Sequence, residues 1–245
     1  MIEGFTLAGA ALFIAASFVA ATVAGVAGFA FGLVAAGIWL HVLTPVETAF
    51  LIVACGALVQ GLSVWKLRHA LDWGRLWPFV LGGALGVPWG AELLRWAEPH
   101  RFREGVGVFL IVYSVYGLAR PKLPQVTGGG RALDGGVGVL SGALGGATGL
   151  GGIVPTIWCG LRGWTKDAQR AVFQPVAVAI HAMTIAWLGG AGAIGARSLQ
   201  LFLLALPAVA AGTWFGLRLY GRLDETGFRR VVLGLLLISG AILLT

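Results

Sequence analysis

The chain alternates long apolar segments with short polar connections. Cutting it at clusters of glycine, proline and charge gives five apolar segments in each half. They cover residues 5–22, 25–43, 47–65, 76–95 and 105–119, and then 135–147, 150–161, 169–189, 199–218 and 229–245. This pattern predicts an all-α chain built from two repeats, residues 1–122 and 131–245, joined by a Pro/Gly-rich linker over 123–130.

The first two segments of each half are separated only by a glycine cluster. In the second half both are well short of the roughly 20 residues that a helix needs to cross a bilayer. We therefore expect glycine-broken or re-entrant helices. Non-helical backbone is tolerated at membrane depth only where protein buries it or a polar cavity solvates it, so the two breaks predict a cavity.

Composition places the chain in a bilayer. It is 58% hydrophobic and only 11% charged, with a mean hydropathy of +0.89, whereas soluble domains carry about 25% charged residues. Its 17 Lys and Arg residues lie mainly between the apolar segments. This placement indicates topology signals rather than a nucleic-acid partner. The prediction is a polytopic integral membrane protein.

The basic residues gather on one predicted side of the membrane. Thirteen of the 17 fall in connections on that side and four on the other, which places the first side in the cytoplasm. A multi-pass protein of the inner (plasma) membrane with both termini outside is expected. Each half then makes an odd net number of crossings, so the halves enter from opposite faces as inverted-topology repeats.

Two sequence registers support the duplication. A shift of 121 superposes Gly25, Gly28 and Phe29 on Gly146, Gly149 and Leu150. A shift of 126 superposes Gly86, Gly90, Phe102 and Arg103 on Gly212, Gly216, Phe228 and Arg229. The five extra residues fall in the loop around residues 189–195, where an insertion is cheap.

Paired glycine clusters open the two repeats, at residues 25–32 (GVAGFAFG) and 145–155 (GGATGLGGIVP), and the segments 44–49 (TPVETA) and 163–175 (GWTKDAQRAVFQP) follow them. With these motifs nearly the whole chain resembles the TauE/SafE sulfite exporter family. It departs from the family pattern at Ala30 and Phe31, where glycine is usual. The resemblance implies export of sulfite or an organosulfonate through a site between the repeats. The alternative is transport of another small anion such as a carboxylate, with or without proton coupling.

The glycine breaks themselves suggest an anion site. A helix that starts inside the membrane turns unpaired N–H groups and the positive end of its dipole toward the cavity. The candidate binding residues at the breaks are Gly28, Gly32, Thr148, Gly149, Gly151 and Gly152. The alternative is that these glycines only permit tight helix packing and that the Thr148 hydroxyl bonds back to its own helix.

Polar side chains inside the long segments are few. Gln60 falls opposite His181 under the shift of 121, so both are expected to approach a central cavity. Arg170 and Gln174 lie four residues apart on one helix face, where they could bind an oxyanion bidentately. The competing interpretations are a snorkelling anchor for Arg170, a helix–helix hydrogen bond for Gln174 and a neutral packing residue for His181.

The remaining residues argue against catalysis and cation coupling. The ten carboxylates lie in predicted tails, loops or segment ends, which gives little support to a cation-coupled mechanism. Hydrolase and nucleotide-binding motifs are absent and the two cysteines stand far apart, so no enzyme activity, cofactor or metal site is expected. The expected partners are a small anion and the lipid bilayer. The sequence leaves open whether identical chains form a homo-oligomer.

Overall fold

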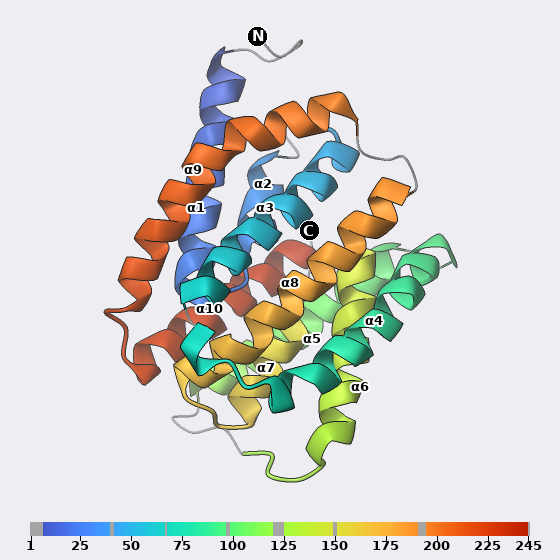
Figure 1. The fold of residues 1–245 in the computed structure, drawn as a ribbon, viewed down its shortest axis with the longest axis vertical. Coiled ribbons are helices and arrows are strands. Elements are labelled where there is room, and N and C mark those ends of the chain that lie inside the picture. Colours follow the sequence, from blue (N-terminus) through green and yellow to red (C-terminus); the bar gives the residue numbers. More distant parts are fainter. Residues whose placement is uncertain are drawn as a thin grey trace.

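The computed structural model describes residues 7–39, 42–66, 68–96, 99–119, 125–148, 151–190 and 195–244. Within these ranges the chain forms ten α-helices, one 3₁₀ turn and no strand (Figure 1). The helices are α1 (Leu7–Ala27), α2 (Phe31–Trp39), α3 (Pro45–Lys66), α4 (Trp73–Trp96), α5 (Pro99–Ala119), α6 (Gly130–Thr148), α7 (Ile153–Leu161), α8 (Lys166–Gly190), α9 (Ala196–Tyr220) and α10 (Glu225–Leu243), with the 3₁₀ turn η1 at Arg68–Ala70. The all-helical class is confirmed, with five helices on each side of the linker.

The second helix of each half is only nine residues long and follows a break. In the first half the break lies further along than expected, because α1 continues to Ala27. Gly28 then has a φ of +88° and donates its N–H to the carbonyl of Ala24 at 2.6 Å. A left-handed glycine is a common way to end a helix. In the second half α6 has 19 residues and is longer than the predicted segment.

A threonine directly precedes the third helix of each half. Glu47 Oε2 accepts hydrogen bonds from the Thr44 backbone N–H at 3.0 Å and hydroxyl at 2.8 Å, while the Glu47 N–H donates to Thr44 Oγ1 at 3.3 Å. This reciprocal arrangement is a capping box. Thr165, 121 residues later, accepts from the Ala168 N–H at 3.4 Å. The shift read from the sequence therefore also relates the starts of α3 and α8.

The two halves interleave. The first helix of each half packs against the fourth helix of the other, α1 on α9 and α6 on α4 (Figure 1). The third helices, α3 and α8, pack on each other, as do the fifth helices, α5 and α10. Exchanging the halves leaves this pattern of pairs unchanged. The repeats seen in the sequence are thus held together mainly by contacts between them.

Glycines bring α1 and α9 together. A Cβ atom added to Gly212 would lie 2.4 Å from the Phe18 carbonyl oxygen, and one added to Gly216 would lie 2.3 Å from that of Thr22. No side chain fits at such distances from backbone. Small residues that let helix backbones approach closely are typical of membrane interfaces.

The same contacts recur between α4 and α6. A Cβ atom added to Gly86 would lie 2.1 Å from the Val139 carbonyl oxygen, and one added to Gly90 would lie 2.0 Å from that of Ala143. These glycines precede the two of α9 by 126 residues, and the two carbonyls follow those of α1 by 121. The two shifts therefore relate the α1–α9 crossing to the α6–α4 crossing. At these positions the role of glycine is to let the two helix backbones pack closely.

Two of the described helices, α1 and α9, are long and apolar enough to cross a membrane by length and composition, with mean hydropathies of 2.2 and 1.6 over their most apolar stretches. Shorter apolar stretches lie at Phe50–Lys66 and Gly107–Ala119. In Figure 1 the linker and the starts of α6 and α10 lie toward the lower end, whereas the starts of α1 and α9 lie at the upper end.

Candidate functional site

A cavity of about 30 Å³ lies where the two halves meet. Its wall combines the start of α2, the start of α7 and side chains from α3 and α8. The lining residues are Phe29, Ala30, Phe31, Gly32, Leu33, Ile52, Gly56, Gln60, Gly152, Ile153 and His181. Two helix N-termini, one from each half, therefore border the same small space. A helix N-terminus carries the positive end of the helix dipole, and its first N–H groups have no partner within the helix.

Gln60 and His181 meet at this cavity. Gln60 Nε2 lies 3.4 Å from His181 Nδ1, and both side chains are buried. Gln60 Oε1 has no hydrogen-bond partner among the described residues. Gly56 makes room for the imidazole, because a Cβ atom there would lie 2.9 Å from His181 Cε1. One polar side chain from each half thus reaches the cavity at positions that the shift of 121 superposes.

The predicted glycines divide into different roles. Gly32 and Gly152 line the cavity, where Gly152 leaves ordinary contact distance to Phe29. Gly28 makes the turn that ends α1. Gly151 packs on α6, with its carbonyl accepting from Ser141 Oγ at 2.5 Å. The side chain of Thr148 and the whole of Gly149 lie outside the described residues.

Arg170 binds the end of α1. It is fully buried, and its Nη2 and Nη1 atoms donate to the carbonyls of Gly25 at 3.0 Å and Val26 at 3.2 Å. Its guanidinium lies 4.0 Å from the centre of the Tyr220 ring, and the Tyr220 hydroxyl donates to Asp167. The carbonyls at the end of a helix have no partner within it. Arg170 therefore supplies from α8 the donors that the interrupted helix lacks.

Gln174 lies one turn beyond Arg170 on α8, against the same break. It is fully buried, and neither amide atom has a hydrogen-bond partner among the described residues. A Cβ atom on Gly28 would lie 3.1 Å from Gln174 Nε2. Arg170 and Gln174 thus flank the first break, and the residues that line the cavity do not include them. Whether either contacts substrate stays a prediction.

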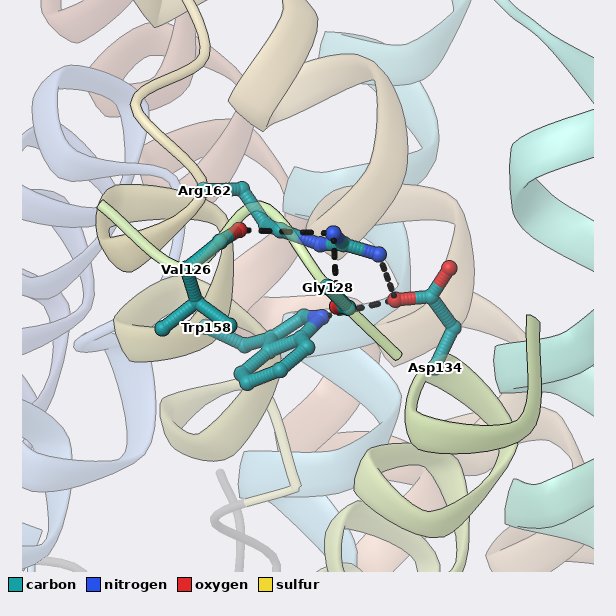
Figure 2. A network of polar contacts seen from close by, with 5 residues as sticks. All are labelled: Val126, Gly128, Asp134, Trp158 and Arg162. Atoms are coloured by element: carbon teal, nitrogen blue, oxygen red, sulfur yellow. Dashed lines mark hydrogen bonds and ion pairs between the residues drawn. The ribbon is translucent and has the colours of Figure 1, made fainter. Parts of the chain in front are cut away.

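A polar network holds the C-terminal end of α7 (Figure 2). Arg162 donates to the linker carbonyls of Val126 at 3.4 Å and Gly128 at 3.2 Å, and its Nη2 lies 3.2 Å from Asp134 Oδ1. Trp158 Nε1 donates to the same carboxylate oxygen at 2.8 Å. Asp134 is one of the ten carboxylates that were predicted to lie in tails, loops or segment ends, and for Asp134 that prediction was wrong. It belongs to α6 and is buried, because Arg162 and Trp158 supply the partners that a buried carboxylate requires.

Removing the Arg162 guanidinium is expected to lower the free energy of unfolding, because it breaks the network that holds the end of α7. Arg162→Met leaves Asp134 nearly buried without its cation, and breaking such a pair costs about 3–5 kcal/mol when the pair is fully buried. Because both side chains keep about a tenth of their surface exposed, we expect roughly 2–3 kcal/mol. Urea or thermal unfolding in detergent measures the loss. The double variant Arg162→Met/Asp134→Leu should recover part of it, and a double variant no better than the single one would contradict the pairing.

Comparison with known proteins settles the family. The sequence profile described as sulfite exporter TauE/SafE matches residues 13–243 of the 245-residue chain. The chain belongs to the TauE/SafE sulfite exporter family. Membership confirms the resemblance seen in the glycine clusters and makes this chain a membrane transporter of a family named for sulfite export. No curated protein and no solved structure matches it.

Within this TauE/SafE chain, sequence reasoning missed several residues around the site. Gly56 could have been found, because the shift of 121 places it on Ala177, another small residue. Asp167 could also have been found, because it lies three residues before Arg170 on the same helix. Tyr220, whose ring faces Arg170 and whose hydroxyl bonds Asp167, comes from α9 and carries no local signal. The partners of Arg170 are backbone carbonyls, which no residue type identifies.

Proposed function

We propose that this protein exports a small sulfur-containing anion, sulfite or an organosulfonate, as a multi-pass protein of the inner (plasma) membrane. The observation that carries the proposal is the convergence of two helix starts and the Gln60–His181 pair on one cavity between the halves. Family membership supports anion export. The cavity supplies a chemical reason for it.

The cavity wall suits an anion. Helix N-termini stabilise negative charge through their unpaired N–H groups and dipoles, and a dry apolar surrounding strengthens that attraction. Gln60 and His181 add side-chain hydrogen bonding at the same place. The described lining contains no carboxylate and no Lys or Arg side chain. Partial charges of this kind hold an anion without trapping it, which transport requires.

The interleaved halves support a mechanism of alternating access. A cavity of about 30 Å³ has room for about one water molecule, so the halves must separate to admit a larger anion. Gln60 on α3 and His181 on α8 would part in this motion, since each belongs to a different half. We propose that the halves are inverted repeats and that rocking one against the other opens the cavity to each side in turn.

The direction of transport needs no coupling ion. An anion that leaves a cell with a negative interior gains about 2.3 kcal/mol per charge per 100 mV. We therefore propose facilitated export driven by the membrane potential and the substrate gradient. Efflux of sulfite from vesicles is expected to follow an imposed potential at constant pH. Strict dependence on a proton gradient at a clamped potential would contradict this mechanism.

Substitutions at the cavity test the site. Sulfite at 100 times its Kd is expected to stabilise the detergent-purified native protein by about 2.7 kcal/mol through mass action. Gln60→Leu and His181→Leu should lose most of this thermal shift and of sulfite efflux, because each removes a polar group from the wall. Thr184→Val is the matched control: it lies on α8 near His181, and its hydroxyl bonds the Ile180 carbonyl of its own helix at 2.9 Å.

The choice of ligands decides the substrate class. Sulfite and ethanesulfonate are compared with acetate and with sodium under the same conditions. Stabilisation by acetate alone would favour a carboxylate transporter, and stabilisation by sodium alone would overturn the anion site. Equal shifts in the native protein and both leucine variants would show that the anion binds elsewhere.

A further inference from the structure

A second and larger cavity lies toward the lower end of the molecule. It measures about 370 Å³ and is lined by residues of the linker, α5, α7, the start of α8 and α10. This volume is within the range of small-molecule binding sites. The lining residues are Tyr113, Gln125, Thr156, Ile157, Gly160, Gly163, Trp164, Gln169, Glu225, Phe228, Arg229, Val232, Leu233 and Leu236.

The two ends of this cavity differ in chemistry. Val232, Leu233 and Leu236 on α10 are buried and form an apolar end. Arg229 lies one turn earlier on α10, and its Nη2 donates to the Gly117 carbonyl at 2.7 Å, which holds the guanidinium at the wall. Glu225 lies at the exposed rim and accepts the backbone N–H of Lys166 at 2.8 Å. A polar end with one basic and one acidic side chain thus leads to an apolar end.

One turn of α7 separates this cavity from the central one. Gly152 and Ile153 line the central cavity, and Thr156 and Ile157 line the larger one. Thr156 Oγ1 donates to the Gly152 carbonyl, one turn earlier on the same helix, at 2.7 Å. Ile153, Ile157 and Leu236 belong to a single buried apolar cluster. The two cavities are therefore in series, with packed side chains of α7 and α10 between them.

We infer that the larger cavity is a cytoplasmic loading chamber that receives an organic anion with a short apolar tail before α7 moves and admits it to the central site. Arg229 selects negative charge at the wall, and the apolar end of α10 accommodates a tail of a few carbons. This inference rests on the proposed export function, which supplies the direction of travel. It adds a binding site and a preference for anions that carry an apolar segment.

Cysteine labelling tests the chamber. Gly160 faces the cavity, and a Cβ atom there would approach nothing closer than the Tyr113 hydroxyl at 3.6 Å, so Gly160→Cys fits. The native Cys55 and Cys159 are fully buried, so the native chain should not react and gives the background labelling. The probes are an anionic sulfonatoethyl and a cationic trimethylammonioethyl methanethiosulfonate, added to the cytoplasmic face of inverted vesicles. Gly136→Cys is the control, because Gly136 on α6 has nothing within 4 Å and lies outside the lining.

The expected result is selective labelling. Relative to their rates with a free thiol, the anionic reagent should modify Gly160→Cys faster than the cationic one, by up to about fivefold. Arg229 lies in the wall, and the exposed Glu225 at the rim offsets part of its charge. Arg229→Gln in the same background should remove this preference. Butanesulfonate should slow the labelling more than methanesulfonate, because only the former has a tail for the apolar end. Val232→Cys provides a second thiol, at that end.

Three results would overturn the chamber: both cysteines unreactive from the cytoplasmic face, equal relative rates for the two reagents, or equal protection by the two sulfonates. Labelling does not require transport, so the two proposals fail separately. Selective labelling without sulfite efflux would remove the proposed substrate and leave the chamber. Sulfite efflux that Gln60→Leu abolishes, together with unreactive cysteines, would support the proposed export function and contradict the chamber.

Discussion

Gly90→Ala is expected to prevent α4 from packing on α6 and to leave little folded protein in detergent. The added methyl group would lie 2.0 Å from the Ala143 carbonyl oxygen, and backbone at that position cannot rotate away as a side chain can. Overpacking costs about 1–3 kcal/mol where side chains can adjust, and we expect at least about 3 kcal/mol here. Thermal unfolding of the purified variant, with its yield in membranes, measures the effect.

Gly136→Ala is the control for this substitution. It lies on α6 in the same helix pair, but nothing stands within 4 Å of the added atom. Alanine should be neutral there or stabilise the helix by up to about 1 kcal/mol, because glycine is the weaker helix former. Gly216→Ala should match Gly90→Ala, since its Cβ atom would lie 2.3 Å from the Thr22 carbonyl oxygen. A harmless Gly216→Ala would contradict the equivalence of the two helix crossings.

Arg170→Met is expected to lower the free energy of unfolding by about 2–4 kcal/mol. Two carbonyls at the end of α1 lose their charged donors, and a buried acceptor left unpaired costs about 1–3 kcal/mol. The methionine keeps much of the side-chain length, so the loss reports mainly on the hydrogen bonds. Since 1 kcal/mol shifts Tm by about 2–4 °C in a chain of this size, the melting temperature should fall by roughly 5–15 °C.

Two further variants separate the causes. Arg170→Lys keeps the charge without the planar fork that reaches both carbonyls, and it should recover only part of the stability. Arg68→Met removes a guanidinium that lies over Trp65 at the surface, and it should change Tm little. If Arg170→Met kept its stability and instead lost the stabilisation by sulfite, Arg170 would be a binding residue, as the sequence pattern suggested.

Much of the architecture follows from the sequence because it depends on properties that every segment carries locally. Ten apolar segments predict the ten helices seen among the described residues, and the two registers match a helix crossing that occurs twice. The predicted helix boundaries were less accurate than the predicted number of helices. The first break lies beyond Gly25, because Gly25 is needed at the crossing with Gly216 and the turn is made by Gly28.

The candidate site was predictable only in part. The pairing of Gln60 with His181 could be read from the shift of 121, since a duplicated fold brings equivalent positions together. Their role in binding an anion stays a prediction. Arg170 and Gln174 were expected to share a ligand because they are four residues apart on one helix. That spacing determines a common face, and the structure shows that this face meets the end of α1.

The sequence by itself determined the helical class, the five-plus-five organisation, the family and the positions of the glycine breaks to within a few residues. Apolar periodicity and glycine spacing are local properties, so they can be read from the sequence alone. Only the tertiary structure decided what lies against each break. The partners of Arg170 are carbonyls about 145 residues away in the chain, and backbone groups are the same at every residue. Which of them meets a given side chain therefore depends on how the helices cross.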